Sequence, residues 1–366
     1  MSEQINKAPQ IAVWGSYLWG NFGDDVMAIM VSRHLQKQGF HPVVYKLDAK
    51  LAEYYGISSE SDINILFSGS IACIVGGGGL LCPDNLMDNE WKKFYHSLSQ
   101  YPIPVHFCSI GGDGNSSLPL LSLYAIKSLL LPNIKSGTVR LESDVKLFEE
   151  LEIDCEFYPD IILSSPIFFP VNSDNYVETK AQKNSKFSIM INLSKRNNIR
   201  IIFKLINLLF IFCHSKITYL RTHLSWLNPS KPPFLDYEYL GSESDEQVVR
   251  YENIEQVRDA LLNSDLIISC KLHAGVFALS YGIPFISING AKKTKAFFDQ
   301  ANINSYFSIG RFYLLRLFFL ILNRKKLSSI IDAIHHNTKL PIFRQKSYGH
   351  FEAIDKFISK YYASTL

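Results

Sequence analysis

The sequence predicts an α/β protein of two domains, each a parallel β-sheet covered by helices on both faces. Its 366 residues exceed the roughly 100–200 residues of one domain. Short apolar runs alternate with helical periodicity along residues 10–290, which is typical of buried parallel strands joined by crossover helices. A segment rich in proline, serine, asparagine and charge interrupts this alternation at residues 164–186. We therefore expect domains at 1–170 and 187–326, a linker at 171–186, and C-terminal helices at 327–366 that pack back on the first domain.

The strands expected in the first half are short and almost entirely apolar. They cover residues 11–14, 41–47, 71–75, 105–110, 138–140 and 156–162. A helix is predicted over residues 24–38, because Val26, Met30 and Leu35 share one face. Asp24 and Asp25 fall in its first turn, where negative charge suits the helix dipole. A second helix is predicted over residues 143–151.

The second half repeats this alternation. Strands are expected at residues 187–193, 216–220, 266–269 and 284–289. Helices are expected at 198–213, at 246–263 in one or two pieces, and at 272–281. The order of elements therefore indicates two parallel sheets built by similar rules.

Composition and short motifs exclude several classes of protein. Lys and Arg total 37 against 34 Asp and Glu, so the net charge of +3 gives no support for nucleic-acid binding. The cysteines form no C-x-x-C pair, which argues against a zinc site, and we expect no metal. The N-terminus is polar and has no signal-peptide pattern. No apolar run reaches the ~20 residues that span a bilayer. We expect a cytoplasmic protein.

One segment, residues 311–326, combines dense Leu and Phe with five basic residues and no acid. A helix of this composition can lie on an anionic membrane surface. It can also be a core helix whose basic side chains reach water. We predict peripheral contact with the inner face of the cell membrane through this segment.

Three glycine clusters follow successive strands of the first domain, at residues 15–23, 76–79 and 111–114. Ligands of open α/β sheets bind beyond the carboxyl ends of the strands, and glycine lets a ligand approach the backbone closely. Tight turns without a ligand are the alternative. Neither a G-x-G-x-x-G nor a G-x-x-x-x-G-K-[ST] pattern occurs, so a dinucleotide site or a P-loop is not supported. The candidate loop residues are Gly20, Asn21, Gly23, Asp24, Asp25, Gly77, Gly78, Gly79 and Asp113.

The most specific pattern lies in the second domain, where Lys271 and His273 follow a strand and open a helix. A helix N-terminus offers unpaired N–H donors and partial positive charge, so a cation and an imidazole there suit a phosphate or carboxylate. The alternative is a packed histidine beside a surface lysine. Further cations at expected strand ends, candidates with Lys271 for binding an anion, are Arg140, Arg221, His223, Lys292 and Lys293.

These motifs, in this order, resemble the polysaccharide pyruvyl transferase family. The resemblance covers about residues 10–300. It rests on the segment Gly20-Asn21-Phe22-Gly23-Asp24-Asp25, on Val75 to Gly79, on Val139-Arg140 with Ser143, on Pro159-Asp160, on Lys271-Leu272-His273-Ala274, and on Gly282-Ile283-Pro284. It implies a GT-B-like fold of two Rossmann-like domains that face a cleft. It also implies transfer of a pyruvyl group from phosphoenolpyruvate to a sugar of a bacterial surface polysaccharide precursor, without a further cofactor.

The resemblance also implies residue roles. His273 matches the histidine of the family's Arg-x-His motif, the candidate general acid, and Arg140 matches an arginine of the family. With this reaction, the candidate loop residues of the first domain are assigned to the acceptor side, and Lys271 and the further cations to donor binding. Lys271 stands where the family has arginine, and Leu141 stands where it has aspartate. A lysine neutralises a phosphate as a point charge but gives no bidentate contact. Two other readings stay open: a glycosyltransferase of similar fold that uses a nucleotide sugar, and a non-catalytic relative.

Overall fold

The computed structural model describes residues 8–81, 87–112, 120–171, 187–193, 216–227, 248–307 and 323–362. The helix predicted at 198–213, Asp113 and nearly all of the basic segment 311–326 lie outside these residues. The chain divides into two compact units. Unit 1 comprises Met1–Gly20, Asp24–Ile161 and Lys346–Leu366, and unit 2 comprises Asn21–Gly23 and Ile162–Gln345.

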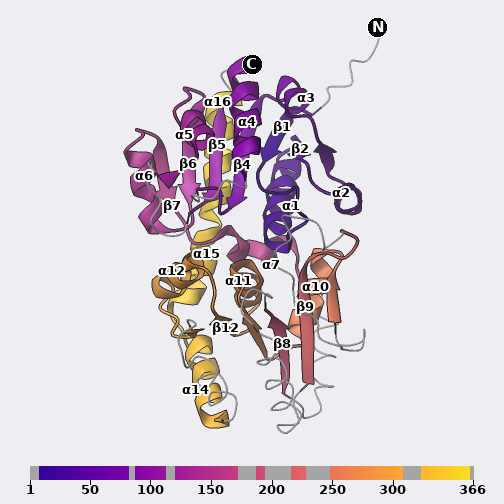
Figure 1. Ribbon diagram of the computed structural model, residues 1–366, viewed down its shortest axis with the longest axis vertical. Helices are drawn as coiled ribbons and strands as arrows, with labels where there is room; N and C mark the ends of the chain where they lie inside the picture. Colours follow the sequence, from indigo (N-terminus) through magenta and orange to yellow (C-terminus); the bar gives the residue numbers. More distant parts are fainter. Residues whose placement is uncertain are drawn as a thin grey trace. The chain divides into compact units, whose positions relative to one another are not determined.

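Unit 1 is built on a seven-stranded sheet in the order β3-β2-β1-β4-β5-β6-β7 (Figure 1). All neighbouring strands pair in parallel. The strands are β1 (Gln10–Trp14), β2 (His41–Tyr45), β3 (Ser58–Glu60), β4 (Ala72–Gly78), β5 (Val105–Ile110), β6 (Ile134–Val139) and β7 (Asp154–Phe157). The central strands β1, β4 and β5 are buried along almost their whole length, which explains their continuous apolar sequence.

Helices enclose this sheet. They are α1 (Phe22–Lys37), α2 (Ala49–Tyr55), α3 (Ile63–Ser68), α4 (Asp88–Gln100), α5 (Leu123–Leu129), α6 (Val145–Glu149) and α16 (Gly349–Tyr362), with the short 3-10 turn η3 (Glu142–Asp144). A second 3-10 turn, η4 (Ile161–Ser164), leads into unit 2. Trp91 and Phe94 of α4 pack on Trp14 of β1, with ring centroids 4.7 and 4.6 Å away. α16 packs against β5 and β6, although it lies at the far end of the sequence.

Unit 2 is built on a six-stranded parallel sheet in the order β10-β9-β8-β11-β12-β13. Its strands are β8 (Ser188–Asn192), β9 (Lys216–Leu224), β10 (Val248–Tyr251), β11 (Leu266–Ser269), β12 (Phe285–Ile288) and β13 (Tyr306–Phe307). Its helices are α7 (Ser165–Phe168), α10 (Ile254–Leu262), α11 (Leu272–Ser280), α12 (Lys292–Gln300), α14 (Arg324–His335) and most of α15 (Lys339–Ser347). The sequence predicted two parallel sheets, each with its own helices, and the structure confirms this.

Several predicted elements need correction. The helix predicted over 246–263 is wrong in its first part, because residues 248–251 form strand β10 and α10 begins only at Ile254, capped by Asn253. The run Val248-Val249-Arg250-Tyr251 has the β-branched and aromatic residues that favour a strand. β4 continues to Gly78, so the glycines at 76–78 belong to a strand rather than to a loop. β9 extends to Leu224, which places Arg221 and His223 inside it. Among the described residues, none of the helices has the length and apolarity needed to cross a membrane.

Candidate functional site

Each sheet has one point where the strand order reverses, and the candidate residues gather at these two points. In unit 1 the order reverses between β1 and β4, and in unit 2 between β8 and β11. The connections that leave such neighbouring strands diverge to opposite faces, which opens a crevice at their carboxyl ends. The loop after β1 and the glycines of β4 lie at the first point. Lys271 and His273, which follow β11, lie at the second.

A buried hydrogen-bond network fixes the turn between β11 and α11. The Ser269 hydroxyl lies 2.9 Å from the Asn192 side-chain oxygen at the end of β8, and the Lys271 N–H donates to the Ser269 oxygen at 2.9 Å. The Asn192 amide donates in turn to the Leu220 carbonyl of β9 at 2.8 Å. The ends of β8 and β11 are thereby tied to the middle of β9, and Lys271 is held as the N-cap residue of α11. Lys271 and His273 are each half-buried.

The segment Asn21–Gly23 packs on this turn as part of unit 2. Gly23 lies so close to the His273 ring that a Cβ at this position would overlap it. Asn21 forms an isolated antiparallel bridge with His223 of β9, and its side chain accepts a hydrogen bond from the Gly23 N–H at 3.1 Å. His223 and His273 therefore flank the same three residues. The sequence analysis had placed Asn21 and Gly23 on the acceptor side and both histidines on the donor side.

Phe22 anchors that segment in the core of unit 2. Its ring meets Tyr251 and Phe277 edge-on, with centroids 5.2 and 5.0 Å away, and it is fully buried. Such aromatic pairs add to the large apolar area that a phenylalanine buries. The position of Gly23 against His273 is thus determined by a buried neighbour.

The remaining cations of unit 2 lie along the carboxyl edge of its sheet. Arg221 is half-buried within β9 on the same side as His223. Lys292 and Lys293 open α12 just beyond β12, the strand next to β11. Lys292 is exposed and Lys293 is half-buried. Parallel strands end at one edge, so all of these groups share the edge that holds His273.

In unit 1, side chains of the protein fill the space beside the glycines. Tyr17 donates a hydrogen bond to the Gly76 carbonyl at 2.6 Å, and burial is the main cause that raises its pKa well above the ordinary value. Gly77 and Gly78 have φ of 61° and 93°, which favours glycine. Met27 lies against Gly77, and the Asp24 carboxylate lies against Gly78. Gly79 is half-exposed, whereas Asp24, Asp25 and Gly20, whose φ is 56°, are buried.

Arg140 lies at the end of β6 and is buried with an ion-pair partner. Its guanidinium is 3.6 Å from the Asp160 carboxylate, and both side chains are at most 2% exposed. Asp144 accepts a hydrogen bond from the Gly112 N–H at 3.0 Å, and Gly111 lies against both Arg140 and Asp144. This geometry braces the carboxyl ends of β5 and β6. A role for Arg140 in holding a donor stays a prediction.

His350 of α16 braces the same region, and the sequence analysis missed it. Its Nε2 is 3.0 Å from the Pro159 carbonyl, and its Nδ1 is 2.7 Å from the Thr138 hydroxyl. The neutral ring therefore donates from Nε2 to the Pro159 carbonyl and accepts at Nδ1 from the Thr138 hydroxyl. It therefore fixes the residue next to Asp160. No local signal could have revealed it, because 191 residues separate His350 from Pro159.

Within the described residues, no group of His, Cys, Asp and Glu could hold a metal ion. The described cysteines, Cys73, Cys108, Cys155 and Cys270, are free. Burial raises the pKa of the Cys73 and Cys108 thiols, which keeps them protonated and unreactive.

Comparisons with known proteins give a family and a fold. The polysaccharide pyruvyl transferase family model matches residues 21–291. No curated protein matches the sequence. Among solved structures, MnaA from S. aureus with UDP is similar, with a TM-score of 0.64, 12% identity and 98% of each chain covered.

Two further structures are similar. The UDP-GlcNAc 2-epimerase from Neisseria meningitidis, bound to UDP-GlcNAc, has a TM-score of 0.61 and 12% identity over 95% of this chain and 100% of that chain. A putative UDP-N-acetylglucosamine 2-epimerase from Listeria monocytogenes has a TM-score of 0.61 and 8% identity over 97% of each chain. Likeness at such identities concerns the fold alone, and it confirms the predicted GT-B-like class.

Proposed function

This chain belongs to the polysaccharide pyruvyl transferase family, and we propose that it transfers a pyruvyl group from phosphoenolpyruvate to a sugar of a bacterial surface polysaccharide precursor. The observation that supports the donor most directly is the arrangement after β11. Lys271 caps α11 and His273 lies in its first turn, both partly exposed at the strand-order reversal of unit 2. An anion placed there meets the N-terminal end of a helix, its dipole and an ammonium.

The proposed reaction uses these groups as follows. His273 delivers a proton to the methylene carbon of phosphoenolpyruvate, and positive charge develops at the carbon that bears the phosphate. One sugar hydroxyl adds at this carbon and loses its proton. A second hydroxyl of the same sugar then displaces inorganic phosphate, which gives a cyclic ketal. Lys271 and the N–H groups of α11 stabilise the charge of the departing phosphate.

The other cations have supporting roles in this proposal. Arg221, Lys292 and Lys293 lie along the same carboxyl edge and would hold the donor carboxylate or the phosphate. His223 and the segment Asn21–Gly23 would position the His273 ring. Arg140 would keep the strand ends of unit 1 in place, since its guanidinium is buried beside Asp160. Contact with a membrane through residues 311–326 remains a prediction.

Ligand-dependent thermal unfolding tests the donor. We expect phosphoenolpyruvate to raise the unfolding midpoint more than the same concentration of inorganic phosphate, because binding to the folded state stabilises it. Lys271→Ala should abolish the difference, and Lys271→Arg should retain it. Lys216→Ala is the matched control, since Lys216 is an exposed lysine that begins β9 at the opposite edge of the same sheet.

Two outcomes would contradict the proposal. One is a midpoint that rises with UDP- or GDP-sugars but not with phosphoenolpyruvate, which would favour a glycosyltransferase. The other is a phosphoenolpyruvate effect that survives in Lys271→Ala. Transfer itself is measured as phosphate release with a glycan acceptor. His273→Ala should reduce the rate at least 100-fold if His273 is the general acid, and a non-catalytic relative would release no phosphate at all.

A further inference from the structure

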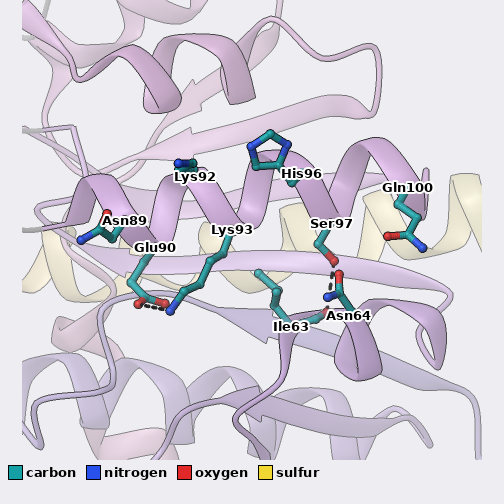
Figure 2. A pocket seen from close by; sticks show the side chains of 9 residues that line it. All are labelled: Ile63, Asn64, Asn89, Glu90, Lys92, Lys93, His96, Ser97 and Gln100. Carbon is teal, nitrogen blue, oxygen red and sulfur yellow. Dashed lines mark hydrogen bonds and ion pairs between the residues drawn. The ribbon is translucent and has the colours of Figure 1, made fainter.

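Unit 1 has a polar recess with a volume of about 590 Å³ between α3 and α4. This volume falls within the roughly 300–1,000 Å³ of small-molecule sites. Figure 2 shows its side chains along α4 and at the start of α3. The residues that line it are Ile63, Asn64, Asn89, Glu90, Lys92, Lys93, His96, Ser97 and Gln100. We call it the α3–α4 groove.

Most of the side chains that line the groove are polar, although their carbon atoms also expose apolar surface. Ile63 is the one apolar side chain, and the others are amides, a hydroxyl, an imidazole, two ammonium groups and a carboxylate. Amides and hydroxyls both donate and accept hydrogen bonds. Such groups beside apolar carbon match a sugar, which carries hydroxyls at its edge and C–H groups on its faces.

A simple anion is a poorer match, because one of the lysines is already engaged. Lys93 donates to the Glu90 carboxylate at 2.9 Å, and Tyr45 and Lys46 donate to it at 2.8 and 3.1 Å. Burial alone would raise the pKa of Glu90, but these donors outweigh it and lower the pKa below the ordinary value. Glu90 is therefore a fixed negative charge in the wall of the groove.

One end of the groove lies at the carboxyl edge of the sheet, the edge at which open α/β sheets generally bind ligands. Tyr45 ends β2, and its bond to Glu90 places the first turn of α4 at the carboxyl edge. From Asn89 to Gln100 the helix rises about 16 Å, at 1.5 Å per residue, and Asn89, His96 and Gln100 follow one another along it in Figure 2. The groove is thus long enough for several linked sugar rings. His96 packs beside Tyr95 and Tyr124, with ring centroids 5.3 and 5.8 Å away, which fixes its place in the wall of the groove.

We infer that the α3–α4 groove binds an oligosaccharide, namely the part of the glycan acceptor that extends away from the sugar being modified. The identity of the glycan as the acceptor rests on the proposed function, but its binding to the groove does not. Asn64, Asn89, His96 and Gln100 are the exposed polar contacts. Glu90 and Ser97 are buried and shape the wall.

An array of immobilised bacterial polysaccharides and their fragments tests this inference. The protein should bind at least one glycan, and more tightly as fragments lengthen from one sugar to four. The double variant His96→Ala/Gln100→Ala should weaken that binding about tenfold or more, as expected when hydrogen bonds are lost. Asn64→Ala/Asn89→Ala should do the same. The matched control is His335→Ala/Gln345→Ala, two exposed residues on α14 and α15 of unit 2, which should bind as the original protein does.

Each result has a definite meaning. The inference is overturned if the original protein binds no glycan on the array, or if both groove variants bind as well as it does. Unchanged thermal midpoints of the variants verify that they fold. The phosphoenolpyruvate midpoint effect is measured on the same proteins. If that effect persists while glycan binding fails, the groove inference falls and the donor proposal stands, and the reverse pattern has the opposite meaning.

Discussion

Two buried histidines should make unit 1 sensitive to mild acid. His106 and His350 are at most 2% exposed, and burial is the main cause that lowers the pKa of each to about 3. Each stays neutral in the folded protein, whereas an unfolded histidine has a pKa of ~6.5. The stabilising effect is therefore complete above pH 6.5 and is lost as the pH falls from 6.5 towards 3.

The magnitude follows from these values. At pH 5.5 an unfolded histidine is about 90% protonated, so each buried histidine lowers the free energy of unfolding by about 1.4 kcal/mol relative to high pH, and the pair by about 3 kcal/mol. Urea unfolding at pH 7.5 and 5.5 measures this difference. Fluorescence is a suitable signal, since Trp14 and Trp91 lie in the unit 1 core.

A variant separates this effect from general acid sensitivity. His350→Gln keeps a donor for the Pro159 carbonyl but no longer titrates, so it should remove about half of the loss between the two pH values. His41→Gln, at an exposed position of β2, should leave the loss unchanged. Equal stability of the original protein at both pH values, or the full loss in His350→Gln, would refute the reasoning.

Three further predictions follow from single contacts. Gly23→Ala should lower the thermal midpoint and reduce activity at least tenfold, because its Cβ would overlap both the Cβ and the ring of His273. Adding His273→Ala should restore neither, since the Cβ of residue 273 remains, and unchanged activity in Gly23→Ala would contradict this reasoning. Phe22→Ala should destabilise unit 2 by about 3–5 kcal/mol in urea unfolding, since it empties the space between Tyr251 and Phe277; an unchanged unit 2 transition would contradict this. Glu90→Gln should cost about 2 kcal/mol near pH 7, because the variant loses the charge that accepts from lysines. That cost should vanish as the pH falls through the lowered pKa of Glu90, and a cost independent of pH would contradict this explanation.

The strands that the sequence predicted best are the buried ones. Residues 105–110 and 266–269 are strands with the predicted bounds, because a strand covered on both faces is a continuous apolar run with clear ends. β3 was missed since its sequence, Ser58-Ser59-Glu60, is polar and lies at the edge of the sheet. Strand β10, at the edge of unit 2, was predicted as part of a helix although Val248, Val249 and Tyr251 favour a strand, because four residues beside a longer helical pattern were merged with it.

The sequence predicted only those parts of the candidate site whose residues are close together in the chain. The sequence was sufficient to place Lys271 and His273 at the start of a helix after a strand. The contact of Gly23 with His273 joins residues 250 positions apart, and only the folded chain reveals it. The burial of Arg140 beside Asp160 likewise depends on the fold, because the short motif around Arg140 does not indicate which carboxylate will lie next to it.

The division of the chain also has a consequence for how the protein is made. The two parts of unit 1 flank unit 2 in the sequence: unit 1 needs Lys346–Leu366, which are synthesised after the long stretch Ile162–Gln345 of unit 2. Domains generally fold as units during synthesis. Here the sheet of unit 1 is synthesised before unit 2, and β5 and β6 stay uncovered by α16 until that helix has been translated. Expression of either half alone would therefore give incomplete proteins: a fragment ending near residue 161 lacks α16, and one starting there lacks Phe22.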